Sequence, residues 1–144
     1  MTMQAAHVDA LISIYEGLSA KSVECLADVY APDAYFKDPF NEVNGIDEIQ
    51  AIFHHMYRQI EEPRFVVHQW SGTQDDGFLV WDMRFRSRMM RGDPEQVIRG
   101  VSHIRFNGAG KVTYHRDYWD TGEELYAKLP VIGWLIGWLR KKLA

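Results

Sequence analysis

An aspartate, Asp38, ends an apolar stretch in the sequence AYFKDPF at residues 34–40. Because a proline follows it, Asp38 is disfavoured from helical geometry and is expected in an extended conformation. A carboxylate that is withdrawn from water binds a proton more readily, which suits a general base working near neutral pH. An aspartate before a proline also often caps a turn by accepting backbone N–H bonds. Both roles are open for Asp38.

A histidine and a second aspartate stand two residues apart, at His115 and Asp117. Alternation along a strand puts side chains at i and i+2 on one face, and this face would carry Thr113, His115, Asp117 and Trp119. In a half-closed cavity the pair could share a proton, which would make His115 a second acid or base. The alternative is a buried pair whose two members only satisfy each other.

The apolar spacing predicts three helices, over residues 4–18, 22–30 and 46–60. Tyr15 lies on the apolar stripe of the first helix, and Tyr30 ends the second; each is either a core residue with a satisfied hydroxyl or a pocket residue. A short extended piece containing Asp38 separates the second and third helices. From Phe65 the period falls to two, which predicts strands over residues 65–71, 78–90, 96–106 and 111–119.

This order predicts an α+β fold, with the helices packed on one face of a curled antiparallel sheet. We expect one domain over residues 1–144, with residues 121–144 as a C-terminal helical extension. From Val131 to Leu139 that extension is apolar almost all round, with Trp134 and Trp138 four residues apart, and three basic residues follow at 140–142. It could lie in a membrane interface, cover a pocket mouth or pack in a dimer.

Composition narrows the classes of function. The 144-residue chain is 47% hydrophobic, which is typical of a globular domain, and carries a net charge of -4. Cys25 is the only cysteine, so no internal disulfide is expected. The first residues do not read as a signal peptide and no apolar run reaches the length of a membrane span. We expect a cytoplasmic protein, peripheral to a membrane only if the C-terminal helix binds one.

Cofactors, metals and nucleic acids are not expected as partners. His54 and His55 are adjacent on a helix and therefore diverge, and no spacing of a zinc site is present. The sequence has no glycine-rich phosphate loop and no nucleic-acid-binding motif.

Three motifs resemble a known family: YAPDAYFKDPF followed by Gly45, HIRFNGAGKV at residues 103–112, and DYWD at residues 117–120. With the order of elements, they resemble the SnoaL-like branch of the nuclear-transport-factor-2-like fold, which ketosteroid isomerase shares. The resemblance implies a cone, built of helices and a bent sheet, that encloses a pocket. It does not imply one activity, because this fold hosts many functions.

The resemblance also implies roles for residues. Asp38 matches the general base of the isomerase, and Tyr15 matches its first oxyanion donor. Ser102 falls where the isomerase has a protonated acid, a departure that weakens the case for steroid-type chemistry. The tryptophan of the YW pair, Trp119, would line the pocket, and the expected ligand-binding set is Tyr30, Phe36, Phe53, Trp81, Met83, Phe85 and Trp119.

Strand parity places a set of basic residues on the outer face of the sheet: Arg84, Arg86, Arg88, Arg99, His103, Arg105 and Arg116. In relatives of this family the outer face often forms a homodimer, so acids of a partner could pair with these residues.

Two functions follow. The first is an isomerase, cyclase or dehydratase without a cofactor, acting on a small apolar molecule with Asp38 as base and His115 and Asp117 returning the proton. The second is a non-catalytic module for a lipid-like ligand, with the C-terminal helix as a lid or membrane anchor.

Overall fold

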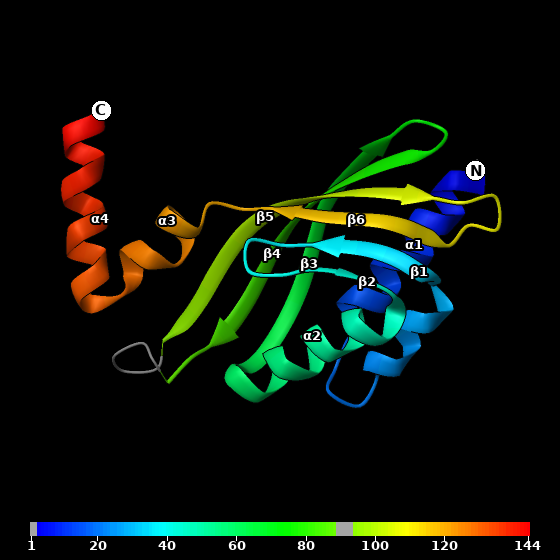
Figure 1. Ribbon diagram of the computed structural model, residues 1–144, viewed down its shortest axis with the longest axis horizontal. Coiled ribbons are helices and arrows are strands. Elements are labelled where there is room, and N and C mark those ends of the chain that lie inside the picture. The colour runs from blue at the N-terminus through cyan, green and yellow to red at the C-terminus, as the bar shows by residue number, and fades with distance from the viewer. Residues whose placement is uncertain (1–2, 89–93) are drawn as a thin grey trace.

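The computed structural model describes residues 3–88 and 94–144. Figure 1 shows a long, curved sheet with α1 and α2 on one side and α4 standing apart at the far end. The helical elements are α1 (Met3–Glu16), η1 (Val23–Asp28), α2 (Ile46–Gln59), α3 (Thr121–Glu124), η2 (Tyr126–Lys128) and α4 (Pro130–Leu143). The strands are β1 (Tyr30–Lys37), β2 (Glu42–Asn44), β3 (Glu61–Gly72), β4 (Asp76–Arg86), β5 (Glu95–Phe106) and β6 (Val112–Tyr118).

The predicted α+β class is confirmed, but the sheet is mixed rather than wholly antiparallel. Its six strands follow the order β2-β1-β6-β5-β4-β3. β1 runs parallel to β6, with Phe36 opposite His115 and Lys37 opposite Arg116. Parallel neighbours need a long connection, and here everything from β2 to β5 supplies it. The four predicted strands are therefore joined by two more, of which β1 contains most of the short extended piece that leads to Asp38.

The second predicted helix, residues 22–30, is wrong in its type and its end. Residues 23–28 form a 3-10 helix, and Tyr30 already begins β1. Pro32 favours an extended Ala31, so the chain leaves helical geometry here. Ala27, expected on the inner side by helical spacing, is exposed, whereas Val23 and Leu26 are buried.

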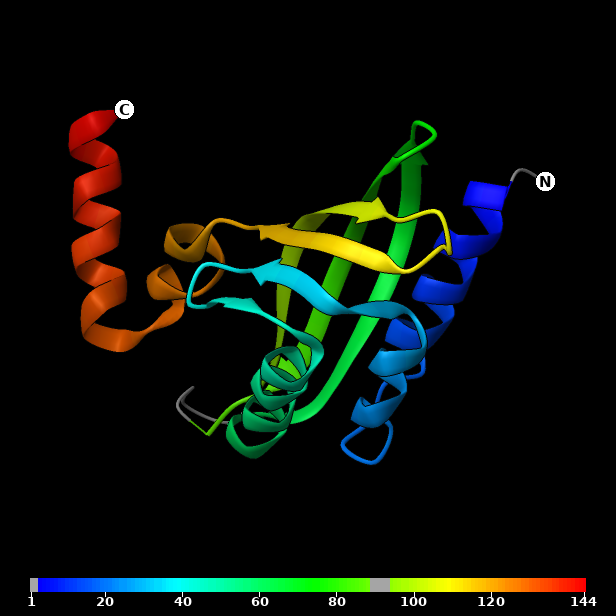
Figure 2. The ribbon, with the colours of Figure 1, turned by 45° about the vertical axis from the view of Figure 1, so that its right-hand side comes forward.

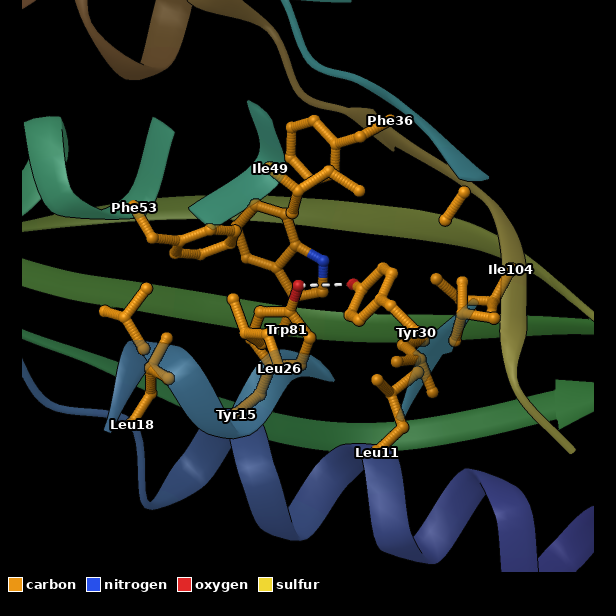
Figure 3. Close-up of a cluster of buried hydrophobic side chains, with 14 of the residues drawn as sticks. Leu11, Tyr15, Leu18, Leu26, Tyr30, Phe36, Ile49, Phe53, Trp81 and Ile104 are labelled. Atoms are coloured by element: carbon orange, nitrogen blue, oxygen red, sulfur yellow. Dashed lines mark hydrogen bonds between the residues drawn. The ribbon is translucent and has the colours of Figure 1, made fainter. Parts of the chain in front are cut away.

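The core lies between α1, α2 and the inner face of the sheet (Figure 3). The helical spacing and the strand alternation are confirmed for the residues expected inside that are buried: Val8, Leu11, Tyr15, Leu18, Ile49, Phe53, Trp81 and Phe85. Leu79, Ile98, Ile104 and Val112 are buried with them. The strand predicted over 78–90 is observed as far as Arg86; its last two residues lie outside the described residues.

The outer face of the sheet carries the predicted basic residues, but acids of the same chain already pair with several of them. Arg105 Nε lies 2.9 Å from Asp76 Oδ1. Arg99 contacts Glu124 at 3.5 Å. Arg116 stacks its guanidinium 4.6 Å from the ring centre of Tyr118. Side chains of the same chain therefore already contact several of the basic residues on this face.

The pair between Arg99 and Glu124 also ties the C-terminal segment to β5. Glu124 is buried, and its second oxygen lies 3.7 Å from Lys128 Nζ. Lys128 donates to the carbonyl of Val97 at 2.9 Å. α3 and η2 are thereby fixed, while α4 leads away from the sheet in both ribbon views (Figure 2). Within the described residues, no helix is long and apolar enough to cross a membrane.

The inner face has one position that only glycine fits. A Cβ at Gly100 would lie 2.5 Å from Cζ2 and 3.0 Å from Cζ3 of the Trp81 indole. We expect Gly100→Ala to lower the free energy of unfolding by about 1–3 kcal/mol, because the indole must move from its packed position. Urea unfolding measures this, and Gly108→Ala is the control, since a Cβ there meets nothing within 4 Å. Equal stability of both variants would contradict the close packing of Trp81 on Gly100.

Candidate active site

A line of polar side chains runs through the apolar core. It begins at Tyr15 on α1, whose hydroxyl oxygen lies 2.5 Å from that of Tyr30 at the start of β1. Figure 3 shows these two phenols facing each other between α1 and the sheet. The Tyr30 oxygen lies 2.6 Å from Nδ1 of His115 on β6. All three residues are buried, with His115 only 3% exposed.

The line continues from His115 to the edge of the core. Nε2 of His115 lies 2.5 Å from Oδ1 of Asp117, as the strand alternation predicts for residues two apart. Ser102 stands opposite Asp117 in the β5–β6 register and donates to the same oxygen at 2.5 Å. Trp81 Nε1 donates in turn to the Ser102 hydroxyl at 2.8 Å. We call this set of six residues, Tyr15, Tyr30, His115, Asp117, Ser102 and Trp81, the relay.

One placement of hydrogens uses every donor of the relay. With Asp117 ionised and the proton of His115 on Nε2, Tyr15 donates to Tyr30, and Tyr30 donates to Nδ1 of His115. From the other side Trp81 donates to Ser102, and Ser102 donates to Asp117. All donors then point along two branches toward one carboxylate oxygen. A full set of partners is what a buried polar group needs, because an unpaired one is costly.

Burial keeps both phenols of the relay neutral. The pKa of Tyr15 is raised well above its usual value, first by removal of the hydroxyl from water and then by the neighbouring Tyr30 and the negative Asp117. The pKa of Tyr30 is raised by the same loss of water, which outweighs the opposing hydrogen bond from Tyr15. The two tyrosines therefore act as hydrogen-bond donors and not as bases.

The relay reaches solvent at Asp117. A groove of about 450 Å³ opens there, lined by Lys37, Asp38, Pro39, Arg116, Asp117, Tyr118, Trp119 and Asp120. The Asp117 side chain is 17% exposed. Within the described parts of the chain, its hydrogen bonds all end on Oδ1, which leaves Oδ2 free to meet a molecule in the groove. A second groove of about 590 Å³ shares Tyr118, Trp119 and Asp120 with the first.

Asp38 lies on this groove but outside the relay. Its Oδ1 accepts from the backbone nitrogens of Phe40 at 2.8 Å and Asn41 at 2.7 Å. The Asn41 side-chain nitrogen donates to both carboxylate oxygens, at 3.1 and 3.2 Å. These contacts are those of a turn cap, the alternative that the sequence left open for this residue.

The structure thus brings together four of the five expected catalytic residues: Tyr15, Ser102, His115 and Asp117. The hydroxyl of Ser102, matched by the resemblance to an oxyanion donor, donates to Asp117 instead of pointing into open space. The sequence predicts Trp81 as a pocket-lining residue and Tyr30 as a core or a pocket residue. Neither helical spacing nor strand alternation shows which polar atoms meet.

Of the expected ligand-binding residues, five are buried in the core: Tyr30, Phe36, Phe53, Trp81 and Phe85. Met83 is half-buried and packs against them. Trp119 lines both grooves and packs edge-on against Phe40, with ring centres 5.7 Å apart. Sequence reasoning missed Lys37, Arg116 and Pro39 as groove residues, because their meeting depends on the parallel pairing of β1 with β6.

No group of three or more metal-binding side chains gathers anywhere in residues 3–88 and 94–144.

The sequence matches a known protein family. A model of the SnoaL-like domain matches residues 11–115. The chain belongs to the SnoaL-like family. No curated protein matches this SnoaL-like chain.

Solved structures share the fold of this SnoaL-like chain at low identity. A nuclear-transport-factor-2-like protein of unknown function from Burkholderia pseudomallei K96243 is 18% identical, with a TM-score of 0.72 over 85% of this chain and 95% of that one. A hypothetical protein with a ketosteroid isomerase-like fold from Catenulispora acidiphila DSM 44928, in complex with trimethylamine, is 16% identical; the TM-score is 0.71, over 86% and 93% of the two chains. A candidate SnoaL-like polyketide cyclase from Shewanella putrefaciens CN-32 is 14% identical, with a TM-score of 0.72 over 89% and 96%. The predicted fold and family are confirmed.

The buried phenols predict a loss of stability in alkali. Because the fold holds Tyr15 neutral, the unfolded chain ionises first, so this contribution is complete below about pH 10 and declines above it. Each such tyrosine adds about 1.4 kcal/mol per pH unit to the slope. We expect Tyr15→Phe to reduce the slope of unfolding free energy against pH by about that amount, measured by urea unfolding above pH 10. An unchanged slope would contradict the burial of this hydroxyl in the neutral form.

The turn cap predicts a structural role for Asp38. Asp38→Ala removes an acceptor for two backbone N–H groups and the Asn41 side chain, and should lower the free energy of unfolding by about 1–2 kcal/mol. Asp38→Asn keeps one side-chain oxygen and should lose less than half of that. Thermal or urea unfolding of the two variants measures these losses. No loss of stability in either variant would contradict the capping role of Asp38.

Proposed function

We propose that this SnoaL-like chain transfers a proton on a small, largely apolar carbonyl compound, as in isomerisation, cyclisation or dehydration, with Asp117 as the general base. One observation carries the proposal: His115 and Ser102 both hold Oδ1 of Asp117, and the same carboxylate lines the groove. A carboxylate fixed by one oxygen presents the other in a constant direction, which is what efficient proton transfer requires.

The proposed proton transfer uses side chains that line the groove. Oδ2 of Asp117 takes a proton from a carbon next to the carbonyl, and the electron pair of the broken C–H bond becomes an enolate. Arg116 lines the same groove, so its positive charge can stabilise the enolate oxygen. Lys37 lines the groove too, but its ammonium already lies 3.0 Å from Glu42 Oε2. The proton then passes from Oδ2 to another carbon or to a leaving group. His115 and Ser102 act here as positioning residues, because they hold Asp117 and do not touch the substrate.

Relatives support a small-molecule role without naming the substrate. One solved relative is a candidate polyketide cyclase, and another was crystallised with trimethylamine. The family resemblance gives the base as Asp38, which lines the same groove. Its hydrogen bonds to Phe40 and Asn41 favour Asp117 for this task, since those bonds already occupy the Asp38 oxygens.

Proton exchange tests the base directly. A cyclic β,γ-unsaturated ketone in D2O reports both deuterium uptake and movement of the double bond by NMR. We expect the wild-type protein to accelerate both, and Asp117→Asn to reduce the rate by about 100-fold or more. Asp38→Asn is the matched control and should stay within about threefold of wild type, as expected for a carboxylate that takes no part in the proton transfer.

Other outcomes of this experiment would assign the general base to Asp38 or support the binding function. Loss of exchange in Asp38→Asn with retention in Asp117→Asn would move the base to Asp38. Saturable shifts of Trp119 and Tyr118 signals without exchange would support the second function, a binding module. One observation supports this second function: every hydrogen-bond donor of the relay already has a partner within the protein.

A further inference from the structure

The last helix, α4, leaves its apolar side chains uncovered. None of its residues is buried. Val131 is 81% exposed, Trp134 73% and Leu143 82%. The set of large exposed hydrophobics on this helix is Val131, Ile132, Trp134, Leu135, Trp138, Leu139 and Leu143. Two ribbon views show α4 standing clear of the sheet (Figures 1 and 2), so an apolar surface of this extent calls for an occupant outside the described fold.

The contact with the rest of the chain shows which way this surface faces. A Cβ at Gly133 would lie 2.5 Å from the carbonyl oxygen of Ala127 in η2, so the glycine side of α4 packs against the body. A Cβ at Gly137, about one turn further on, would meet nothing within 4 Å, so this close contact is made at the start of α4. At about 100° per residue, the apolar side chains cover an arc of roughly 200° centred opposite these glycines. The apolar arc therefore points away from the protein.

The basic residues at the end of α4 indicate what kind of partner its apolar arc contacts. Arg140, Lys141 and Lys142 follow the apolar residues, and the last acid of the chain is Glu124. Residues 1–139 carry thirteen basic and twenty acidic residues, so the end of α4 is opposite in sign to the rest of the chain. Lys142 Nζ lies 5.1 Å from the ring centre of Trp138, which brings a cation and an aromatic ring together at this end. Tryptophan with flanking cations suits the boundary between lipid headgroups and acyl chains.

We propose that α4 binds the surface of an anionic lipid membrane, lying in the interface with its apolar arc inserted and its basic end among the headgroups. At about 1.5 Å per residue the helix is roughly 21 Å long, which is short of a span and suits a position parallel to the surface. A groove on a second copy would cover a stripe of about 100°, half of the exposed arc, so a lipid surface fits the arc better. The family model matches residues 11–115, a range that does not include α4.

Co-sedimentation with vesicles tests the proposal on the full chain. Phosphatidylcholine vesicles with and without phosphatidylserine are the probes. We expect strong recovery with phosphatidylserine, weaker recovery without it, and release as salt is raised. Lys141→Glu should weaken binding by at least about fivefold, whereas Lys21→Glu, an exposed position on the body, should leave it near wild type. Trp134→Ser should weaken binding by at least about tenfold because its indole no longer inserts.

Two controls separate loss of membrane binding from loss of folding and from an effect on the groove. Circular dichroism melting should show Trp134→Ser as folded as wild type, and its deuterium exchange on the ketone should be unchanged, which separates this test from that of the groove. Equal recovery with and without vesicles would overturn the proposal. So would a concentration-dependent dimer that both substitutions in α4 dissociate, because a second copy would then occupy the arc.

Discussion

The buried relay from Tyr15 to Asp117 is the constraint on which the other features of this chain depend. Its polar atoms sit among aromatic rings, where each unpaired donor or acceptor would cost on the order of 1–3 kcal/mol. The partners come from α1, β1, β6, β5 and β4, so the bonds form together only when all five elements have the correct register. A one-residue slip of β6 would turn His115 and Asp117 to the outer face and take from Tyr30 its partner Nδ1 of His115. The relay therefore selects one arrangement among those that the apolar pattern alone allows.

Much of that arrangement can be predicted from local pattern. The stripe Val8, Leu11 and Tyr15 repeats at helical spacing, and a one-sided core is the physical result of such spacing. Alternation along β6 is enough to place His115 and Asp117 on one face, and the family resemblance, in which Trp119 lines the pocket, implies that this face is the inner one. The family motifs add the order of the elements and the bent sheet. What these features share is that each depends on residues close together in the chain.

The rest depends on contacts between distant segments. Whether Ser102 meets Asp117 is fixed by the β5–β6 register, and whether Lys37 meets Arg116 is fixed by the parallel pairing of β1 with β6. Neither register leaves a local signature, because a polar residue on an inner face looks the same opposite any neighbour. Asp38 illustrates the same limit: its sequence context fits a base and a turn cap equally, and only the folded turn brings the donors of Phe40 and Asn41 to its carboxylate.

The groove and α4 meet in one short segment. β6 ends at Tyr118, and Trp119 and Asp120 line both grooves before the chain enters α3. Asp120 also caps α3, accepting from the backbone nitrogen of Glu123 at 3.1 Å. One residue later Glu124 pairs with Arg99, which fixes η2 and with it the base of α4. A molecule in either groove would therefore lie against Asp120, the residue that caps α3, and a ligand that took the Asp120 carboxylate would weaken that cap. Because linkage is reciprocal, any change in α4 that a ligand produces must be matched by an equal effect of α4 binding on the affinity of the groove.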